Sequence, residues 1–199
     1  MNRRLLLAIC AMAMTGLAAP ASSAPSSNPA DMQAGQYELD KNHASVLAKV
    51  SHFGLSTYVF RFDRFDASFS YSPQQPTASR VNVSIDLNSM NTGYEKADKE
   101  FPPQFLGTDK SPTATFASTK ITRDGNRGVM TGDLTLNGVT KPVTLDVVFN
   151  GYESTGPQAG KAGFHATGAL KRSDFGLGKY APLVGDQVEL EINVEFRRK

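Results

Sequence analysis

The sequence predicts an all-β domain, an antiparallel up-and-down barrel of about eight strands with one short helix. Apolar and polar residues alternate with period two through most of the chain after Tyr37, which is typical of half-buried strands. Turn-forming pairs such as Asn-Gly and Asp-Gly separate the alternating runs. Alternation alone also fits a β-sandwich, but the consecutive hairpin-like connections and one long, aromatic-rich, bulged strand favour the barrel.

The first 24 residues have the features of a secretory signal peptide. Arg3 and Arg4 give it a positive start, and the apolar run over residues 5–17 is too short to be a typical membrane span. Small residues then fit cleavage after Ala21 or Ala24, and an uncleaved anchor is the alternative. We therefore expect an exported protein, with the bacterial periplasm as its location.

Residues 25–35, which are rich in Pro, Ser, Asn and Ala, are predicted to form a flexible mature N-terminus. One domain is expected over residues 36–199, because no shift in composition and no internal repeat divides them. The single cysteine, Cys10, lies in the leader, so a cleaved chain has no disulfide and no thiolate chemistry. The chain has 21 Lys+Arg and 19 Asp+Glu, and two of the arginines belong to the leader. A neutral body argues against nucleic acid as a partner and against a polybasic membrane anchor.

The first alternating run, over residues 46–52, predicts a strand whose apolar face extends from Val46 to His52. The next run, over residues 57–71, changes phase near Asp63 and Arg64. A β-bulge at that point would keep the apolar residues before and after it on one face.

Further strands are predicted over residues 81–87, 130–136, 143–149 and 187–196. Asn137-Gly138 predicts a tight hairpin between the second and third of these runs.

The helix is predicted from Thr92, which forms a capping box with Glu95, to Pro102, which ends it. A Glu95–Lys99 pair supports it, and one apolar stripe is expected. That stripe would contain Tyr94, Ala97 and Phe101.

The sequence carries no recognisable catalytic motif: no G-x-S-x-G, H-E-x-x-H or phosphate-binding loop occurs. The three histidines, His43, His52 and His165, are far apart. We interpret His43 as a hydrogen-bonded turn residue and the other two as core or pocket residues. We therefore expect no enzyme, no metal site and no catalytic cofactor.

Several aromatic residues are predicted to face inward, either lining a cavity or filling a packed core. They are Phe60, Phe62, Phe65, Phe69, Phe116, Phe164 and Phe175. Small residues that are also assigned to the inner face would leave space between these rings. They are Ala48, Ala67, Gly163 and Ala166.

Six segments carry a family resemblance, in order and at matching spacing. They are residues 37–50 (YELDKNHASVLAKV), 52–57, 61–66, 131–145, 172–176 and 184–186. On these segments the chain resembles the YceI-like family of lipid or polyisoprenoid-binding proteins. The stretch 98–103 departs from the family pattern by lacking its His and basic residue, and Phe60 stands where the family commonly has Gly.

The resemblance implies an antiparallel eight-stranded lipocalin-like barrel with an elongated apolar cavity. The cavity would hold a polyisoprenoid, an isoprenoid quinone or a similar lipid, which would be the one bound cofactor. We expect a set of inward side chains to line it, with two further residues near its mouth. The lining set is Val50, His52, Phe62, Phe116, Phe164 and Phe175, and the mouth residues are Phe105 and Leu106. Tyr180 and His52 are the candidates for contacting a polar head group, because each has an apolar body and a hydrogen-bonding tip.

Three functions remain in order of preference: a lipid carrier, an envelope structural or interaction protein with a packed barrel, and an enzyme acting on an isoprenoid lipid. Transient membrane contact is part of the first hypothesis. The oligomeric state stays open, with a homodimer as one alternative.

Overall fold

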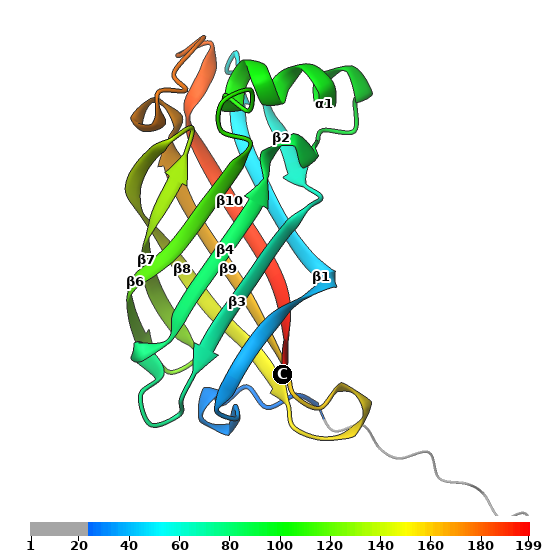
Figure 1. Cartoon of the computed structure of the whole chain (residues 1–199), viewed down its shortest axis with the longest axis vertical. Coiled ribbons are helices and arrows are strands. Elements are labelled where there is room, and N and C mark those ends of the chain that lie inside the picture. The colour runs from blue at the N-terminus through cyan, green and yellow to red at the C-terminus, as the bar shows by residue number, and fades with distance from the viewer. Residues whose placement is uncertain (1–23) are drawn as a thin grey trace, which may run out of the picture.

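A computed structural model describes residues 24–199, which form a closed antiparallel barrel with one short helix (Figure 1). The predicted signal peptide lies outside these residues, apart from Ala24. The strands are β1 (Gly35–His52), β2 (Ser56–Phe62), β3 (Phe65–Tyr71), β4 (Arg80–Asp86), β5 (Met90–Asn91), β6 (Thr113–Asp124), β7 (Arg127–Leu136), β8 (Val139–Glu153), β9 (Lys161–Lys171) and β10 (Val184–Arg198). The α-helix is α1 (Glu95–Phe101).

The barrel is a nearly continuous meander in which strands that follow one another along the chain lie side by side. The hydrogen-bonded order is β10-β9-β8-β7-β6-β4-β3-β1-β2-β5, and β1 also pairs with β10 to close the ring. β2 and β3 are two halves of one interrupted strand, since both pair with β1. With the two-residue β5 as an addition to β2, eight strands form the wall, which confirms the predicted architecture.

The phase change near Asp63 and Arg64 is a strand break and not the predicted β-bulge. β2 ends at Phe62 and β3 begins at Phe65, and residues 62–67 do not pair with β1. The predicted consequence of the phase change is confirmed: apolar side chains before and after the break share one face, which is the barrel interior.

The Asn137-Gly138 hairpin is confirmed. Both residues have positive φ angles, 52° and 73°, and Leu136 pairs with Val139 across the turn. A left-handed backbone at both turn positions matches the twist of the flanking strands, which is why Asn-Gly is favoured there. The two strands extend beyond the predicted runs, so that Pro142 lies within β8, opposite Asp133.

The helix differs from its prediction at both ends. Thr92 Oγ1 accepts a hydrogen bond from the Tyr94 amide, but the carboxylate that accepts from the Thr92 amide, at 2.7 Å, belongs to Asp98 and not to Glu95. Pro102 does not end the helical path, because a π-helical turn (Pro102–Leu106) continues it to Gly107. A proline is tolerated at the start of a new turn, where its missing N–H has no required partner.

The other helix predictions are partly confirmed. Lys99 Nζ lies 2.6 Å from Glu95 Oε1, as the spacing predicted. Ala97 is 1% exposed, but Tyr94 is 60% exposed and lies outside the buried stripe.

The segment 25–35 contacts the barrel, although its composition predicted flexibility. Ser26 pairs with Tyr152, the Tyr71 hydroxyl donates to the Pro29 carbonyl at 2.7 Å, and Met32 is 3% exposed. This segment lies at the end of the barrel where the C-terminus also lies, which we call the lower end (Figure 1). The end that carries α1 is called the upper end.

The interior contains two clusters of buried apolar residues. The upper cluster includes Phe62, Leu136, Val143, Leu145 and Phe175. The lower cluster includes Met32, Tyr37, Phe69, Phe149, Tyr152, Ala162 and Phe196.

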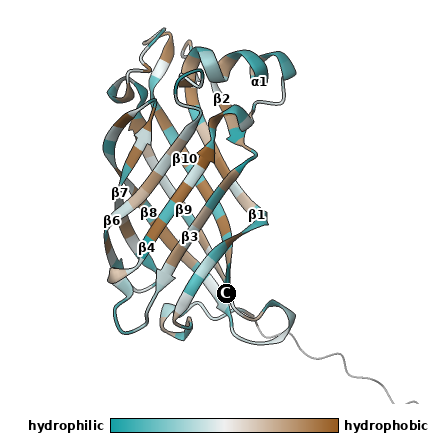
Figure 2. Ribbon diagram, viewed as in Figure 1, coloured by the Kyte–Doolittle hydropathy of each residue, from teal (hydrophilic) through white to brown (hydrophobic). Residues whose placement is uncertain are grey.

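Hydrophobic and hydrophilic residues alternate along the strands, while α1 is mostly hydrophilic (Figure 2). Within residues 24–199 no helix has the length and apolar character needed to cross a membrane.

Candidate ligand cavity

The barrel interior encloses a cavity of about 330 Å³. Its walls are the inward side chains of the strands, which are almost all apolar. All eight strands of the wall contribute, with β2 and β3 counted as one strand. Representative residues are Ala48, Phe62, Phe65, Val83, Phe116, Leu134, Leu145, Phe164, Ala166 and Ile192.

The space exists because several inward positions carry small side chains. Ala48, Ala67 and Ala166 all line the cavity, as the sequence predicted. Gly163 does not, because Phe164 occupies the inward position and a Cβ at Gly163 would instead face the Asn150 Cβ at 3.7 Å.

Aromatic rings pack the lower part of the interior. The Phe69 ring lies 5.7 Å from Phe164 and 4.9 Å from Phe196, both edge-on, and it stacks on Tyr37 at 4.8 Å. These are preferred geometries for aromatic pairs. The rings therefore form a rigid wall at this end of the cavity.

The dimensions suit an elongated apolar molecule. The volume is about twice that of an engineered apolar cavity of ~150 Å³ that binds benzene. Along β10 the lining extends from Leu190 to Phe196, which corresponds to roughly 20 Å of strand.

Four of the predicted site residues line the cavity, and five do not. Phe62, Leu106, Phe116 and Phe164 belong to its wall. The side chains outside the wall are Val50, His52, Phe105, Phe175 and Tyr180.

Those five residues lie at the upper end, beyond the cavity. Phe175 is 1% exposed and packs in the upper cluster, while His52 is exposed at the end of β1. The Phe105 ring lies 5.7 Å from Tyr180, which is 45% exposed and accepts a hydrogen bond from Gln104. Alternation predicts which side chains of a strand face inward, but not where along the strand the cavity ends. Contact of these five residues with a ligand stays a prediction.

Sequence reasoning missed the lower end of the cavity. Met32 lines it from the N-terminal segment, and Arg123 and Arg127 line it near the β6–β7 turn. The pairing of β6 with β7 shifts register between Ser118 and Lys120, which changes the residues that face inward. The sequence gives no signal for that shift.

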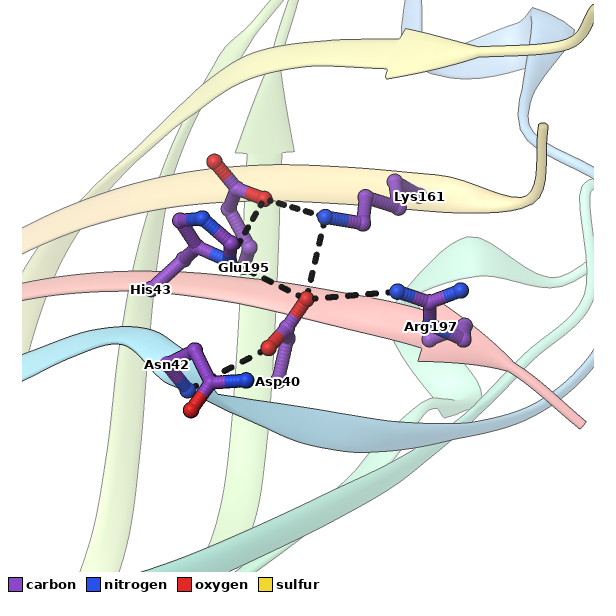
Figure 3. Close-up of polar contacts among 6 residues, drawn as sticks. All are labelled: Asp40, Asn42, His43, Lys161, Glu195 and Arg197. Atoms are coloured by element: carbon purple, nitrogen blue, oxygen red, sulfur yellow. Dashed lines mark hydrogen bonds and ion pairs between the residues drawn. The ribbon is translucent and has the colours of Figure 1, made fainter. Parts of the chain in front are cut away.

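A polar cluster lies on β1, β9 and β10 (Figure 3). Lys161 Nζ lies 3.0 Å from Asp40 Oδ2 and 3.1 Å from Glu195 Oε2. The hydrogen bond from Lys161, together with one from His43, holds the pKa of the nearly buried Asp40 carboxyl well below its usual range.

Asp40, His43 and Glu195 are close enough to chelate a metal ion. The Lys161 ammonium already bridges the two carboxylates, and Arg197 lies 3.5 Å from Asp40. The cluster is therefore an ion-pair network. The sequence interpretation of His43 as a hydrogen-bonded residue agrees with its 3.2 Å contact to Asp40, but its assignment to a turn was wrong, because His43 lies within β1.

A barrel of eight antiparallel strands around an apolar hollow is the architecture of proteins that hold one small ligand. Within that class the chain belongs to the YceI-like family, because the YceI-like domain matches residues 37–196. It is 41% identical to a UPF0312 protein of Enterobacter sp. (strain 638) over 166 residues, covering 81% of this chain and 86% of the relative. It is 40% identical to the protein YceI of Salmonella arizonae with the same coverage.

Solved structures share the fold. The Campylobacter jejuni YCEI protein superimposes with a TM-score of 0.67 at 29% identity, covering 76% of this chain and 91% of that one. Burkholderia cenocepacia BcnA gives a TM-score of 0.70 at 23% identity, covering 79% and 98% of the two chains. A polyisoprenoid binding domain from Saccharophagus degradans gives 0.64 at 16% identity, covering 84% and 100%.

Proposed function

We propose that this protein binds a long apolar lipid, such as a polyisoprenoid or an isoprenoid quinone, inside the barrel and carries it in the periplasm. The observation that supports this most directly is the 330 Å³ cavity, whose wall is almost entirely apolar. The Saccharophagus domain with the same fold is described as polyisoprenoid-binding, which favours the same ligand class. Export is proposed from the leader sequence alone.

The energetics of binding follow from the lining. Each buried methylene contributes about 0.8 kcal/mol, so a five-carbon isoprene unit contributes roughly 3–4 kcal/mol at most. Two or three units offset the lower range of the cost of association, which is about 4–15 kcal/mol. The ligand needs no charged contact inside the barrel for this.

The two alternatives have less support. A packed structural barrel would not contain this cavity. An enzyme would need an acid–base pair beside its substrate, and the wall formed by residues 24–199 contains no Asp, Glu or His.

The test is a binding series with geraniol, farnesol and geranylgeraniol against the mature protein, followed by displacement of an apolar fluorescent probe. We expect the affinity to rise with each isoprene unit until the cavity is full. Native mass spectrometry of protein purified from its own host envelope would identify the natural cargo. A clean apo mass together with no uptake of any prenol would refute the carrier function and favour the structural barrel.

Export is tested separately by cell fractionation and N-terminal sequencing. Periplasmic recovery with a new N-terminus after Ala21 or Ala24 is the expected result. A full-length chain held in the cytoplasm would contradict it.

A further inference from the structure

The barrel wall is interrupted on one side, between β1 and the β2–β3 strand. Pairing of β1 with β2 ends at Leu47 opposite Arg61, and pairing with β3 resumes at Glu38 opposite Ser68. Residues 39–46 and 62–67 therefore face each other without a backbone ladder. A surface groove of about 660 Å³ lies at this gap, and the ribbon shows the two strands separating there (Figure 1).

The β1 side of the gap is held in place by contacts that point away from it. Leu39 pairs with Phe196 and Ala44 with Val194, so β1 carries extra residues here relative to β10 and bulges outward. Asp40, within this bulge, is fixed to β9 and β10 by Lys161 and Arg197 (Figure 3). Bulges of this kind locally end strand pairing.

The opposite side of the gap is fixed as well. The Asp63 amide donates to the Ser89 carbonyl at 3.0 Å, and the Arg64 amide donates to Ser89 Oγ at 2.9 Å. Arg64 also pairs with Asp86 at 2.8 Å. These contacts turn the backbone of the strand break toward β4 and away from β1, so the gap is a built feature of the wall.

Two aromatic rings separate the groove from the cavity. Phe62 and Phe65 line both of them. Phe65 packs against the upper and the lower cluster, so it lies where the two meet. Across the gap Lys41 Nζ contacts Asp66 Oδ2 at 2.6 Å, but both side chains are more than 60% exposed, and such surface pairs contribute little.

We propose that this gap is a side portal through which an apolar chain enters and leaves the cavity when the Phe62 and Phe65 rings turn aside. The inference rests on the proposed function. Opening the portal breaks no backbone hydrogen bond between the facing strands, and regions with few such bonds open most easily.

The two ends of the barrel are less suited to the passage of an apolar chain. The upper end is closed by buried residues such as Phe175 and Pro102. The lower end is the competing route, but Met32 of the N-terminal segment is buried there and the rim carries Arg123 and Arg127.

A reversible cross-link across the gap tests the portal. The mature chain has no cysteine, so Lys41→Cys with Asp66→Cys gives two unique thiols. A short bis-methanethiosulfonate reagent bridges them, and dithiothreitol removes the bridge. The matched control is Thr131→Cys with Thr144→Cys, an exposed pair whose hydroxyls lie 3.1 Å apart on the continuously paired β7 and β8.

Stopped-flow uptake of a fluorescent farnesol analogue is measured with and without the bridge. We expect the gap bridge to slow uptake and release together by about tenfold or more, as for a blocked gate, and to leave the equilibrium affinity nearly unchanged. Reduction should restore both rates, and the control bridge should change neither. Phe65→Ala should speed uptake as well as release, because a ring lost from the cavity wall alone would change mainly the release rate.

If the protein with the bridged gap takes up the ligand at the unbridged rate, the portal is overturned and entry at the lower end is indicated. Absence of binding in all variants, bridged and unbridged, would overturn the proposed function itself and this inference with it.

Discussion

Enlarging one cavity-lining alanine separates a ligand-binding barrel from a packed one. Ala166 lies on β9, is 7% exposed and contributes to the cavity wall. Ala166→Leu adds three carbons to that space. If the cavity is empty in the apo protein, burying these carbons adds about 2 kcal/mol to the free energy of unfolding, by the methylene contribution of ~0.8 kcal/mol.

The same three carbons occupy room that the ligand would use. We expect the affinity for a cavity-filling prenol to fall by about 2 kcal/mol, or about 30-fold. Stability of the apo protein therefore rises while affinity falls. Urea unfolding and a prenol titration of the same preparation measure the two quantities.

Ala162 provides the matched control on the same strand. It is 1% exposed, packs in the lower cluster and does not line the cavity. Ala162→Leu should destabilise the protein by about 1–3 kcal/mol, as overpacking does. If Ala166→Leu destabilises the protein as much as Ala162→Leu, the interior is packed in solution and the reasoning from the cavity is refuted.

Three further predictions concern charge, burial and the membrane. Lys161 holds the pKa of Asp40 below its usual range, so the stability from this carboxylate is present at neutral pH and is lost as the pH falls toward the lowered pKa. Asp40→Asn should therefore cost about 1–3 kcal/mol in urea unfolding at pH 7, and an equal cost at pH 3 would contradict this. Arg172 is 7% exposed and donates hydrogen bonds to the carbonyls of residues 177, 179, 184 and 185. Arg172→Met should therefore lower the free energy of unfolding by at least about 3 kcal/mol, measured by thermal unfolding. A loss below about 1 kcal/mol would argue against a structural role for these bonds. Phe53 and Leu55 are 51% and 88% exposed at the upper end. If this end contacts the membrane, changing both residues to Ser should weaken binding to liposomes by about tenfold or more in a sedimentation assay. Unchanged binding would show that this end does not contact the membrane.

The barrel could be predicted because its signals are local. Alternation along 187–196 assigns Leu190 and Ile192 to the inside without knowledge of their neighbours, and both line the cavity. The Asn137-Gly138 turn is determined by the backbone preferences of two residues. Local rules were weaker for the helix, where Asp98 competes with Glu95 for the same amide.

The site could be predicted only in part, because it depends on where distant segments meet. The contribution of Met32 requires the N-terminal segment to fold under the barrel, which no periodicity indicates. The gap beside Phe65 follows from which residues of β1 lack partners, and the cluster around Asp40 joins residues more than 100 positions apart. These are consequences of strand pairing, which the sequence of any single strand does not specify.

The pairing of the first strand with the last determines when the fold can be completed. Tyr37 lies opposite Arg198, and the Lys199 amide donates to the Gln36 carbonyl at 3.0 Å. A chain that emerges N-terminus first therefore has two unpaired strand edges until β10 has emerged, and such edges are prone to associate with other chains. Loss of β10 would leave an open sheet and not a smaller barrel, so the interior is shielded from water only after β10 has paired with β1.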